Sequence, residues 1–426
     1  MGLPVRERVI SGGSNQQNKG NGGVIPMDDI QVLICDDSAL MRNLISRIVD
    51  STKGLHTVGT AMNGKFCLQK IPALNPDIII LDIEMPEMNG LEFLKERRAR
   101  QIDIPVIVLS SIATKGATVT MQCLELGASD FITKPSGSIS SNINSVGGDL
   151  VELIASYGRR YAARKGKDVY PMDFFLREAK LKEAESAAKK EGISDKIKPA
   201  ETTRSQPEEL PKTLLQSKKK EPAVIEPLRK GGPIDIIALG ISTGGPNALR
   251  EVFAKLDPKL PRPILVVQHM PAGFTKEFAA SLNRICPLEV KEAEDGDLIH
   301  PGQIYIAPGD FHIKVEKSTL CNVIRLSKED LRNGHRPSAD VLFESVAKLY
   351  QNRALGVIMT GMGRDGAAQL AEMRKQGAWT LGQDEKSSIV YGMPRAAFEL
   401  GAVQKQVALE GMAAAINSTV LEHVNG

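Results

Sequence analysis

The sequence lacks an excess of either charge and lacks any long hydrophobic run. Its 426 residues carry 54 Lys and Arg against 51 Asp and Glu, a formal net charge of +3. This near-balance argues against a protein built around nucleic-acid affinity. The longest apolar runs, such as residues 78–81 and 264–267, are strand-sized and fall far short of the ~18 residues of a membrane span. We therefore expect no nucleic-acid partner and no direct membrane insertion.

Paired cysteines and targeting signals are also missing. The five cysteines are widely scattered and none forms a C-x-x-C pair, which disfavours a disulfide framework or a structural zinc site and suits a reducing cytoplasm. Residues 1–20 contain no apolar segment of the secretory kind. Position 6 is Arg6 rather than Ser or Thr, so the Met1-Gly2 start does not predict myristoylation. A cytoplasmic protein is expected.

The chain divides by composition into four segments. Residues 1–27 are rich in Gly, Asn, Gln and Ser and predict a disordered tail. Residues 28–165 alternate short apolar runs with amphipathic stretches in five strand–helix repeats. Strands that are apolar throughout indicate a parallel sheet covered on both faces, and therefore a doubly wound α/β domain. Residues 166–230 are polar and charged and predict a solvated linker, with a basic docking arm as the alternative and a surface helix over 174–191.

A second α/β domain is expected over residues 231–421. Strand-like runs and helical patterns alternate again from residue 234, interrupted by two adjacent strand-like runs at 312–317 and 322–327. This order predicts a second doubly wound parallel sheet with a hairpin insertion. In such sheets the functional groups collect at the carboxyl ends of the strands.

Five polar residues end strands of the first domain: Asp36, Asp37, Asp82, Ser110 and Lys134. Neighbouring strands lie ~4.8 Å apart, so these strand ends can converge. Clustered carboxylates need a compensating cation, and oxygen ligands suit Mg²⁺. A lysine and Mg²⁺ beside a nucleophilic carboxylate would neutralise a transferring phosphoryl group, which a serine could then hydrogen-bond. The alternative, that the aspartates cap helices, suits one aspartate better than the whole set.

These residues lie in motifs that resemble the response-regulator receiver family over about residues 28–135. The motifs are ICDDS (34–38), LDIEMPEMNG (81–90), VLSS (108–111) and FITKP (131–135). The resemblance implies that Asp82 is phosphorylated by a histidine kinase. It also implies that Mg²⁺ binds to Asp36, Asp37, Asp82 and the backbone carbonyl of Glu84. Phe131 stands at the family's aromatic switch position, with plain core packing as the alternative.

The second domain opens with Gly240-Ile241-Ser242-Thr243-Gly244-Gly245, directly between a strand and a helix. A serine at such a turn exposes its hydroxyl at the sheet edge beside helix-terminal amides. His269 ends the next strand and could act as the base, and Asp365 follows a later apolar strand and could orient the histidine. Taken singly, these residues also fit a phosphate-binding turn, a buried histidine and a helix cap. Together they favour a Ser-His-Asp triad in an order that is not that of α/β-hydrolases.

The order and the surrounding motifs resemble the chemotaxis protein-glutamate methylesterase family over about residues 234–421. The motifs are GISTGGP (240–246), QHMPAGFT (268–275), IYIAPGD (304–310), GHRPSADVLF (334–343), MTGMGRDGA (359–367) and YGMPRAA (391–397). The resemblance implies hydrolysis of glutamyl methyl esters on cytoplasmic helices of chemotaxis receptors, and deamidation of receptor glutamines, without an esterase cofactor. It places Thr243 and Met362 near the oxyanion and Arg336 in the substrate cleft, where a surface-loop role for Arg336 is the alternative.

The resemblance further implies regulation: the unphosphorylated receiver packs over the active-site edge, and phosphorylation of Asp82 opens it. A rival interpretation is a catalytically idle adaptor that only binds receptors. A transcriptional regulator would instead need a basic helix-turn-helix output, whereas residues 234–426 show strand–helix alternation without a basic face.

Overall fold

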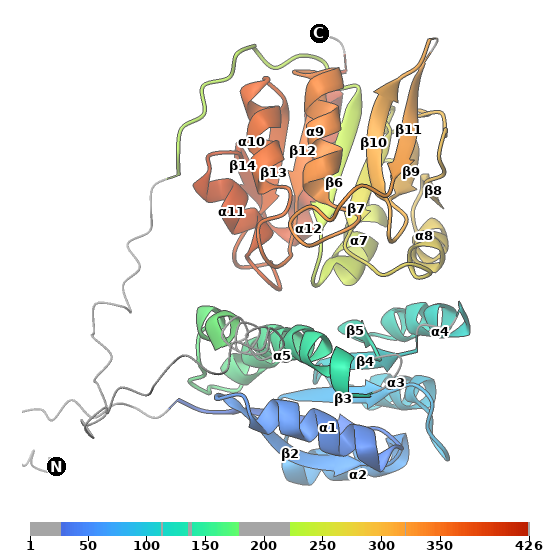
Figure 1. Cartoon of the computed structure of the whole chain (residues 1–426), viewed down its shortest axis with the longest axis vertical. Coiled ribbons are helices and arrows are strands. Elements are labelled where there is room, and N and C mark those ends of the chain that lie inside the picture. The colour runs from blue at the N-terminus through green and yellow to red at the C-terminus, as the bar shows by residue number, and fades with distance from the viewer. Residues whose placement is uncertain (1–26, 112–113, 135–138, 179–221, 320, 425–426) are drawn as a thin grey trace, which may run out of the picture.

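The computed structural model describes residues 27–111, 114–134, 139–178, 222–319 and 321–424. Within these ranges the chain forms two α/β domains built on separate parallel sheets, and Figure 1 shows the first domain lying against one edge of the second. The predicted fold class is confirmed. The predicted tail, except Met27, and residues 179–221 of the predicted linker lie outside the described residues. In the described part of the chain, no helix has both the length and the apolar character needed to cross a membrane.

The first domain contains a parallel sheet with the strand order β2-β1-β3-β4-β5. Its strands are β1 (Ile30–Cys35), β2 (Leu55–Ala61), β3 (Ile78–Asp82), β4 (Val106–Ser110) and β5 (Asp130–Thr133). Its helices are α1 (Ala39–Asp50), α2 (Gly64–Leu74), α3 (Gly90–Ala99), α4 (Thr114–Glu125) and α5 (Ile139–Arg164). Successive side chains of a strand point to opposite faces. Leu33 and Cys35 therefore pack with α2, α3 and α4, whereas Val32 and Ile34 pack with α1 and α5.

The described ends of the predicted linker pack onto the two domains. Val169 pairs with Asp28, and residues 172–178 are helical. Phe175 in this helix is buried in the first domain. At the other end, the Leu228 amide donates to the Lys375 carbonyl oxygen at 2.8 Å in the second domain. These segments are therefore parts of the two domains.

The second domain contains a parallel sheet with the strand order β14-β13-β12-β6-β7-β9-β8. Its strands are β6 (Ile236–Ile241), β7 (Ile264–Gln268), β8 (Glu289–Glu292), β9 (Gln303–Ile306), β12 (Ala354–Ile358), β13 (Trp379–Gln383) and β14 (Lys405–Val407). The predicted hairpin is present as a separate antiparallel pair, β10 (His312–Lys317) with β11 (Asn322–Ser327).

Helices cover both faces of this second sheet. They are α7 (Gly245–Phe253), α8 (Thr275–Asn283), α9 (Ala339–Tyr350), α10 (Ala367–Lys375), α11 (Met393–Glu399) and α12 (Leu409–Glu422). Ile237, Leu239 and Ile241 of β6 share a core with α7, α8 and α12. Ile236 and Ala238 share the opposite core with α9, α10 and α11.

The first strand of each domain lies inside its sheet, with a later strand on each side. β1 lies between β2 and β3, and β6 lies between β7 and β12. The helices that follow β1 and β3 cover opposite faces of the sheet, as do those that follow β6 and β12. Chains that diverge in this way leave a crevice at the carboxyl ends of the two central strands. The predicted site residues lie at these two crevices.

A close approach between α9 and β6 brings the helix up to the end of the strand that precedes Ser242. A Cβ atom at Gly240 would lie 2.7 Å from the Ala339 Cβ and 3.2 Å from the Phe343 Cζ. Glycine at position 240 therefore permits α9 to lie against the end of β6, two residues before Ser242.

We predict that Gly240→Ala lowers the free energy of unfolding by about 1–3 kcal/mol, because the added methyl group overpacks this contact. Denaturant unfolding followed by fluorescence of Trp379, the only tryptophan of the chain, measures the change. Gly411→Ala is the matched control, because the nearest atom to its added Cβ would be the Val407 Cγ1 at an ordinary 3.6 Å. Equal effects of the two substitutions would contradict the close-approach argument.

Candidate active site and candidate phosphorylation site

Ser242 lies in the turn between β6 and α7. Its amide donates to the Thr360 carbonyl oxygen at 2.9 Å, and its own carbonyl accepts from the Gly245 amide at 2.7 Å. Gly244 caps α7 with a φ of +79°, a conformation that side chains rarely adopt. The turn thereby holds the serine hydroxyl at the positive end of α7.

His269 follows β7, the neighbour of β6. Its Nδ1 lies 3.1 Å from the Ser242 Oγ. The buried amide group of Gln268 links the two segments, because its Nε2 donates to the Ser242 carbonyl at 3.0 Å and to the His269 carbonyl at 3.1 Å. The Gln268 side chain thus links the backbone of the serine turn to the backbone at His269, in addition to the contact between the Ser242 and His269 side chains.

Asp365 completes the contact from the loop after β12. Its Oδ2 lies 2.8 Å from the His269 Nε2. The carboxylate also accepts hydrogen bonds from Ser338 Oγ (2.6 Å), the Ala339 amide (2.7 Å) and Asn333 Nδ2 (2.8 Å). Burial alone would raise the pKa of Asp365, but hydrogen bonds and the charge of His269 outweigh it and hold the pKa well below its usual range. The carboxylate therefore stays ionised beside the imidazole.

The three side chains form a continuous hydrogen-bonded chain at one sheet edge. With the proton on Nε2, the imidazole donates to Asp365 and leaves Nδ1 free to accept from the serine hydroxyl. Serine proteases of the chymotrypsin type present Nε2 to the serine instead. Either ring nitrogen can take up the hydroxyl proton, so the arrangement fits nucleophilic acyl transfer.

The remaining residues that the resemblance places at the site are Thr243, Met362 and Arg336. Thr243 is next to the serine, and its carbonyl accepts from Thr360 Oγ1 at 2.9 Å. Met362 directly follows Gly361, which borders the serine, since a Cβ added at Gly361 would lie 2.7 Å from the Ser242 Cβ. Arg336 is held by Asp310, to which its Nη2 donates at 2.6 Å. This contact engages the Arg336 guanidinium within the loop.

His335 also touches the site, although the sequence reasoning did not select it. Its ring stacks on His269 with a centroid separation of 3.9 Å and an interplanar angle of 15°. Burial, assisted by the charge of His269 and opposed by that of Asp365, lowers the pKa of His335 to about 4. The sequence signal that could have drawn attention to His335 is the preceding Asn333-Gly334, a dipeptide typical of tight turns.

The candidate phosphorylation site occupies the crevice of the first sheet. Asp36, Asp37 and Asp82 offer carboxylate oxygens that all lie within 4.8 Å of one another. The Lys134 Nζ lies 2.7 Å from the Asp82 Oδ2 and 3.4 Å from the Asp36 Oδ2. That Asp36 oxygen is buried and has no hydrogen-bond partner. A cluster of oxygens with one such open ligand atom fits a hard divalent cation such as Mg²⁺.

Burial raises the pKa of Asp82, although the Lys134 ammonium acts in the opposite direction. Ser110 is buried and its Oγ lies 2.5 Å from the Thr120 Oγ1, so in this structure it is engaged with α4. Glu84 is exposed. The structure therefore brings Asp36, Asp37, Asp82 and Lys134 together and leaves the Ser110 hydroxyl facing a neighbouring helix.

The two candidate sites are joined through the contact between the domains. Asp130, at the start of β5, accepts from the Gly244 amide at 3.0 Å and from the Tyr157 hydroxyl at 3.1 Å. Phe131 stacks on Phe274 with a centroid separation of 5.0 Å. Strand β5 of the first domain therefore contacts the turn that carries Ser242, two residues before Gly244.

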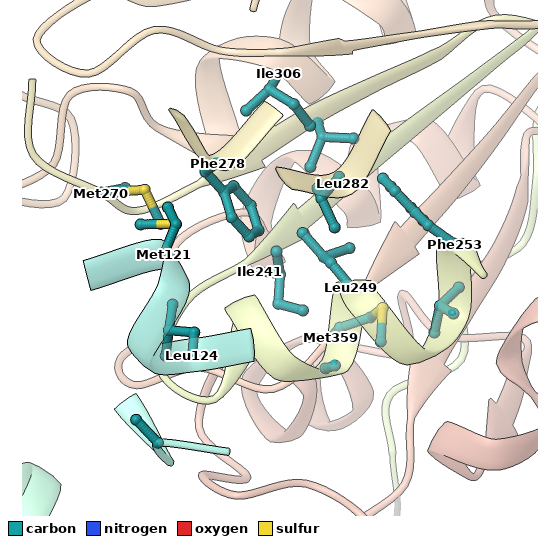
Figure 2. Packing of buried hydrophobic residues seen from close by; sticks show 14 of the residues in the cluster. Met121, Leu124, Ile241, Leu249, Phe253, Met270, Phe278, Leu282, Ile306 and Met359 are labelled. Carbon is teal, nitrogen blue, oxygen red and sulfur yellow. The ribbon is translucent and has the colours of Figure 1, made fainter. Parts of the chain in front are cut away.

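Helix α4 extends this contact along α7 and α8. Figure 2 shows Met121 of α4 beside Met270 of the second domain, and Leu124 of α4 and Phe278 of α8 belong to the same buried cluster. At its end, Glu125 forms an ion pair with Arg284 at 2.5 Å and lies 3.7 Å from Arg250. The interface thus combines an apolar centre with a charged rim.

Comparison with known proteins gives separate matches for the two domains. A family model described as CheB methylesterase matches residues 237–416, and one described as response regulator receiver domain matches residues 32–140. The crystal structure of the Thermotoga maritima CheB methylesterase catalytic domain is 36% identical, with 44% of this chain and 99% of that chain covered and a TM-score of 0.43. The Thermotoga maritima CheB response regulator domain is 42% identical, with 31% and 97% covered and a TM-score of 0.29.

Curated relatives match nearly the whole chain. The protein-glutamate methylesterase/protein-glutamine glutaminase of Treponema denticola is 56% identical, covering 92% of this chain and 98% of its own length. The protein of the same name from Treponema pallidum is 52% identical, with 92% and 97% covered. Both family resemblances are therefore confirmed. The chain belongs to the protein-glutamate methylesterase/protein-glutamine glutaminase family, hydrolases in which a receiver domain precedes a CheB methylesterase domain.

Proposed function

We propose that this protein hydrolyses methyl esters on glutamate side chains of chemotaxis receptors, deamidates receptor glutamines, and is activated by phosphorylation of Asp82. The observation that carries the proposal is the hydrogen-bonded chain from Ser242 through His269 to the ionised Asp365. An idle adaptor would not need a serine, an imidazole and a buried carboxylate in mutual contact at a sheet crevice.

In this mechanism Ser242 is the nucleophile and His269 the general base. The Ser242 Oγ attacks the ester carbonyl as its proton passes to the His269 Nδ1, and Asp365 stabilises the imidazolium through Nε2. The imidazolium then protonates the methoxy oxygen, the C–O bond to it breaks, and methanol leaves, which gives an acyl-enzyme at Ser242. Water that loses a proton to His269 then attacks the acyl carbonyl, the bond to the Ser242 Oγ breaks as that oxygen takes the proton back, and the free glutamate is released. A glutamine amide follows the same path with ammonia as the leaving group.

Backbone amides around Ser242 would donate hydrogen bonds to the substrate carbonyl oxygen and stabilise the negative charge that develops on it. The turn at Thr243 and the segment at Met362 border the serine, and the α7 N-terminus adds its dipole. We assign Thr243 and Met362 to this oxyanion site. Arg336 we assign to the support of the surrounding loop rather than to substrate contact, since Asp310 holds its guanidinium.

The receiver would take a phosphoryl group from a histidine kinase onto Asp82. Asp36, Asp37, Asp82 and the Glu84 carbonyl would hold Mg²⁺, which neutralises the clustered carboxylates and the phosphoryl oxygens. Lys134 already bridges Asp82 and Asp36 and would pair with the added phosphate. Ser110 would have to leave Thr120 to reach it, a movement in the β4–α4 region that faces the second domain.

The contact between the domains would keep the unphosphorylated enzyme inactive toward receptors. It places β5 against the Ser242 turn and α4 against α7 and α8, beside the catalytic edge of the sheet. A bundle of receptor helices needs access to this edge. Phosphorylation would favour a receiver conformation that releases it.

We predict that Ser242→Ala lowers the rate of methanol release from methylated receptor fragments by at least ~10³-fold, because the covalent path is lost. Ser418→Ala is the control, since that hydroxyl donates within its own helix to the Ala415 carbonyl oxygen. Demethylation by Ser242→Ala at the wild-type rate would refute the assignment.

The low pKa of Asp365 predicts a specific pH dependence of stability. Its folded-state pKa lies below the ~3.9 of an unfolded aspartate, so its stabilising effect is present above that value and is lost as pH falls through the folded pKa. The free energy of unfolding of the wild type, followed by Trp379 fluorescence, should fall more steeply below about pH 5 than that of Asp365→Asn. Asp310→Asn is the control, since its ion pair with Arg336 is solvent-screened. Parallel curves for wild type and Asp365→Asn would contradict the prediction.

The interface predicts a charge-reversal phenotype. Glu125→Lys places an ammonium against Arg284 and Arg250, so unphosphorylated activity on receptors should rise several-fold, as expected when an ion pair of at most about 1 kcal/mol becomes a repulsion. Adding Asp82→Asn should abolish stimulation by acetyl phosphate with Mg²⁺ but leave that raised basal activity intact.

Glu96→Lys is the matched control for Glu125→Lys, because Glu96 pairs with Arg100 on its own helix α3. We expect this control to keep the wild-type basal rate and the wild-type response to acetyl phosphate. Basal activity of Glu125→Lys no higher than that of the control would count against inhibition through this interface.

A further inference from the structure

A tight turn at Arg332–His335 stands over the catalytic pair. Arg332 and His335 exchange backbone hydrogen bonds of 3.1 and 3.0 Å. Asn333 and Gly334 have φ values of 55° and 83°, and Asn-Gly is the dipeptide preferred where both central residues need positive φ. A Cβ at Gly334 would meet nothing within 4 Å. Glycine is therefore required there by the backbone conformation and not by packing.

The turn delivers two side chains to the His269–Asp365 pair. Asn333 Nδ2 donates to Asp365 Oδ1 at 2.8 Å and to Asp340 Oδ2 at 2.6 Å. His335, on the other side of Gly334, lays its ring against His269 at 3.9 Å. One short turn thus contacts both the carboxylate and the imidazole.

The segment is anchored on both sides of the stacking ring. Arg336 donates to Asp310 Oδ1 through Nε at 3.0 Å and Nη2 at 2.6 Å, and its Nη1 donates to the Glu329 carbonyl at 2.9 Å. Arg332 pairs with Glu344 of α9 at 3.6 Å. These contacts fix the turn to the hairpin side and to α9, so the His335 ring cannot move away freely.

The His269 ring needs such a support. Its hydrogen bonds to Ser242 and Asp365 fix the two ring nitrogens, but the ring can still tilt about the line that joins its two partners. A parallel ring in van der Waals contact opposes that tilt and covers one face from water. Proton transfer requires good alignment at both nitrogens, because hydrogen bonds weaken steeply as they bend.

The charges around His335 suit this role. The titratable groups that face it are His269 and Asp365, while Arg332 of its own turn is paired with Glu344. Burial, together with His269, lowers the pKa of His335 to about 4. A ring that is neutral at physiological pH can stay stacked when His269 becomes an imidazolium, whereas two adjacent cations would repel each other.

We propose that His335 is a positioning residue, whose imidazole stacks on His269 and holds that ring in the plane that joins Ser242 to Asp365. The Asn333-Gly334 turn delivers it, and Arg336 acts through this turn. The inference rests on the esterase function proposed above and extends it by one residue that acts through the general base.

The test uses the full chain, activated by acetyl phosphate and Mg²⁺, with methanol release from a methylated receptor fragment as the readout. Rates are normalised to the fraction of enzyme that a serine-reactive phosphonate labels. We expect His335→Ala to lower kcat by about 10- to 100-fold with little change in KM, because misplacement of a catalytic group by ~1 Å costs up to ~10²-fold. His335→Phe keeps a stacked ring and should restore most of kcat. His300→Ala, at an exposed histidine, should match the wild type.

The pH profile separates positioning from a general structural role. In His335→Ala, water reaches the His269 ring and favours its charged form, so the acid limb of kcat/KM should move to higher pH, whereas His335→Phe should keep it in place. Wild-type kcat in His335→Ala, or equal losses in the Ala and Phe variants with an unmoved acid limb, would overturn the proposal.

Ser242→Ala in parallel distinguishes the two levels of inference. If it is inactive while His335→Ala equals the wild type, only the positioning role is wrong. If it retains wild-type turnover, the esterase assignment fails and the inference falls with it.

Discussion

The constraint on which this structure depends is the convergence of parallel strands at one sheet edge. In each domain the first strand lies between later strands, and the helices that follow β1 and β3, like those that follow β6 and β12, cover opposite faces. Polar residues placed after those strands must therefore meet in a crevice. The rule assembles the aspartate cluster with Lys134 in the first domain and Ser242, His269 and Asp365 in the second. One architecture thus supports two chemistries, set by the residues at the strand ends.

The surroundings of two buried carboxylates, Asp365 and Asp82, shift their pKa values in opposite directions and suit them to different roles. Asp365 accepts hydrogen bonds from an imidazole, a hydroxyl, an amide side chain and backbone, so its pKa falls despite burial. Asp82 has Lys134 and one backbone amide, and the nearby Asp36 acts against ionisation, so burial prevails and its pKa rises. A fully bonded carboxylate suits an orienting role, because little capacity remains for another partner. A carboxylate with fewer bonds suits an acceptor that must gain a group.

The contact between the domains brings the phosphorylation-site edge of the first sheet close to the Ser242 edge of the second sheet. Asp130 begins the strand that ends next to Lys134, and its carboxylate binds the amide of Gly244 beside the serine turn. The Phe131–Phe274 stack and the α4 cluster extend the same surface. A change at the phosphorylation site therefore has only a short path to the esterase edge, through β5 and the β4–α4 region.

The sequence by itself predicted the two parallel sheets, one after the other along the chain, and proposed the triad residues, because apolar runs and strand-end polar residues are local signals. It also located Asp36, Asp37, Asp82 and Lys134. The tertiary structure alone decided the rest. The stack of His335 on His269, the donors Asn333 and Ser338 to Asp365, and the engagement of Ser110 with Thr120 join residues from loops whose paths no periodicity describes. Arg336 lies in a motif whose resemblance predicted a cleft residue, but its guanidinium pairs with Asp310, which comes from a loop distant in the sequence. Local patterns specify elements, whereas contacts between loops arise only when the sheets bring their ends together.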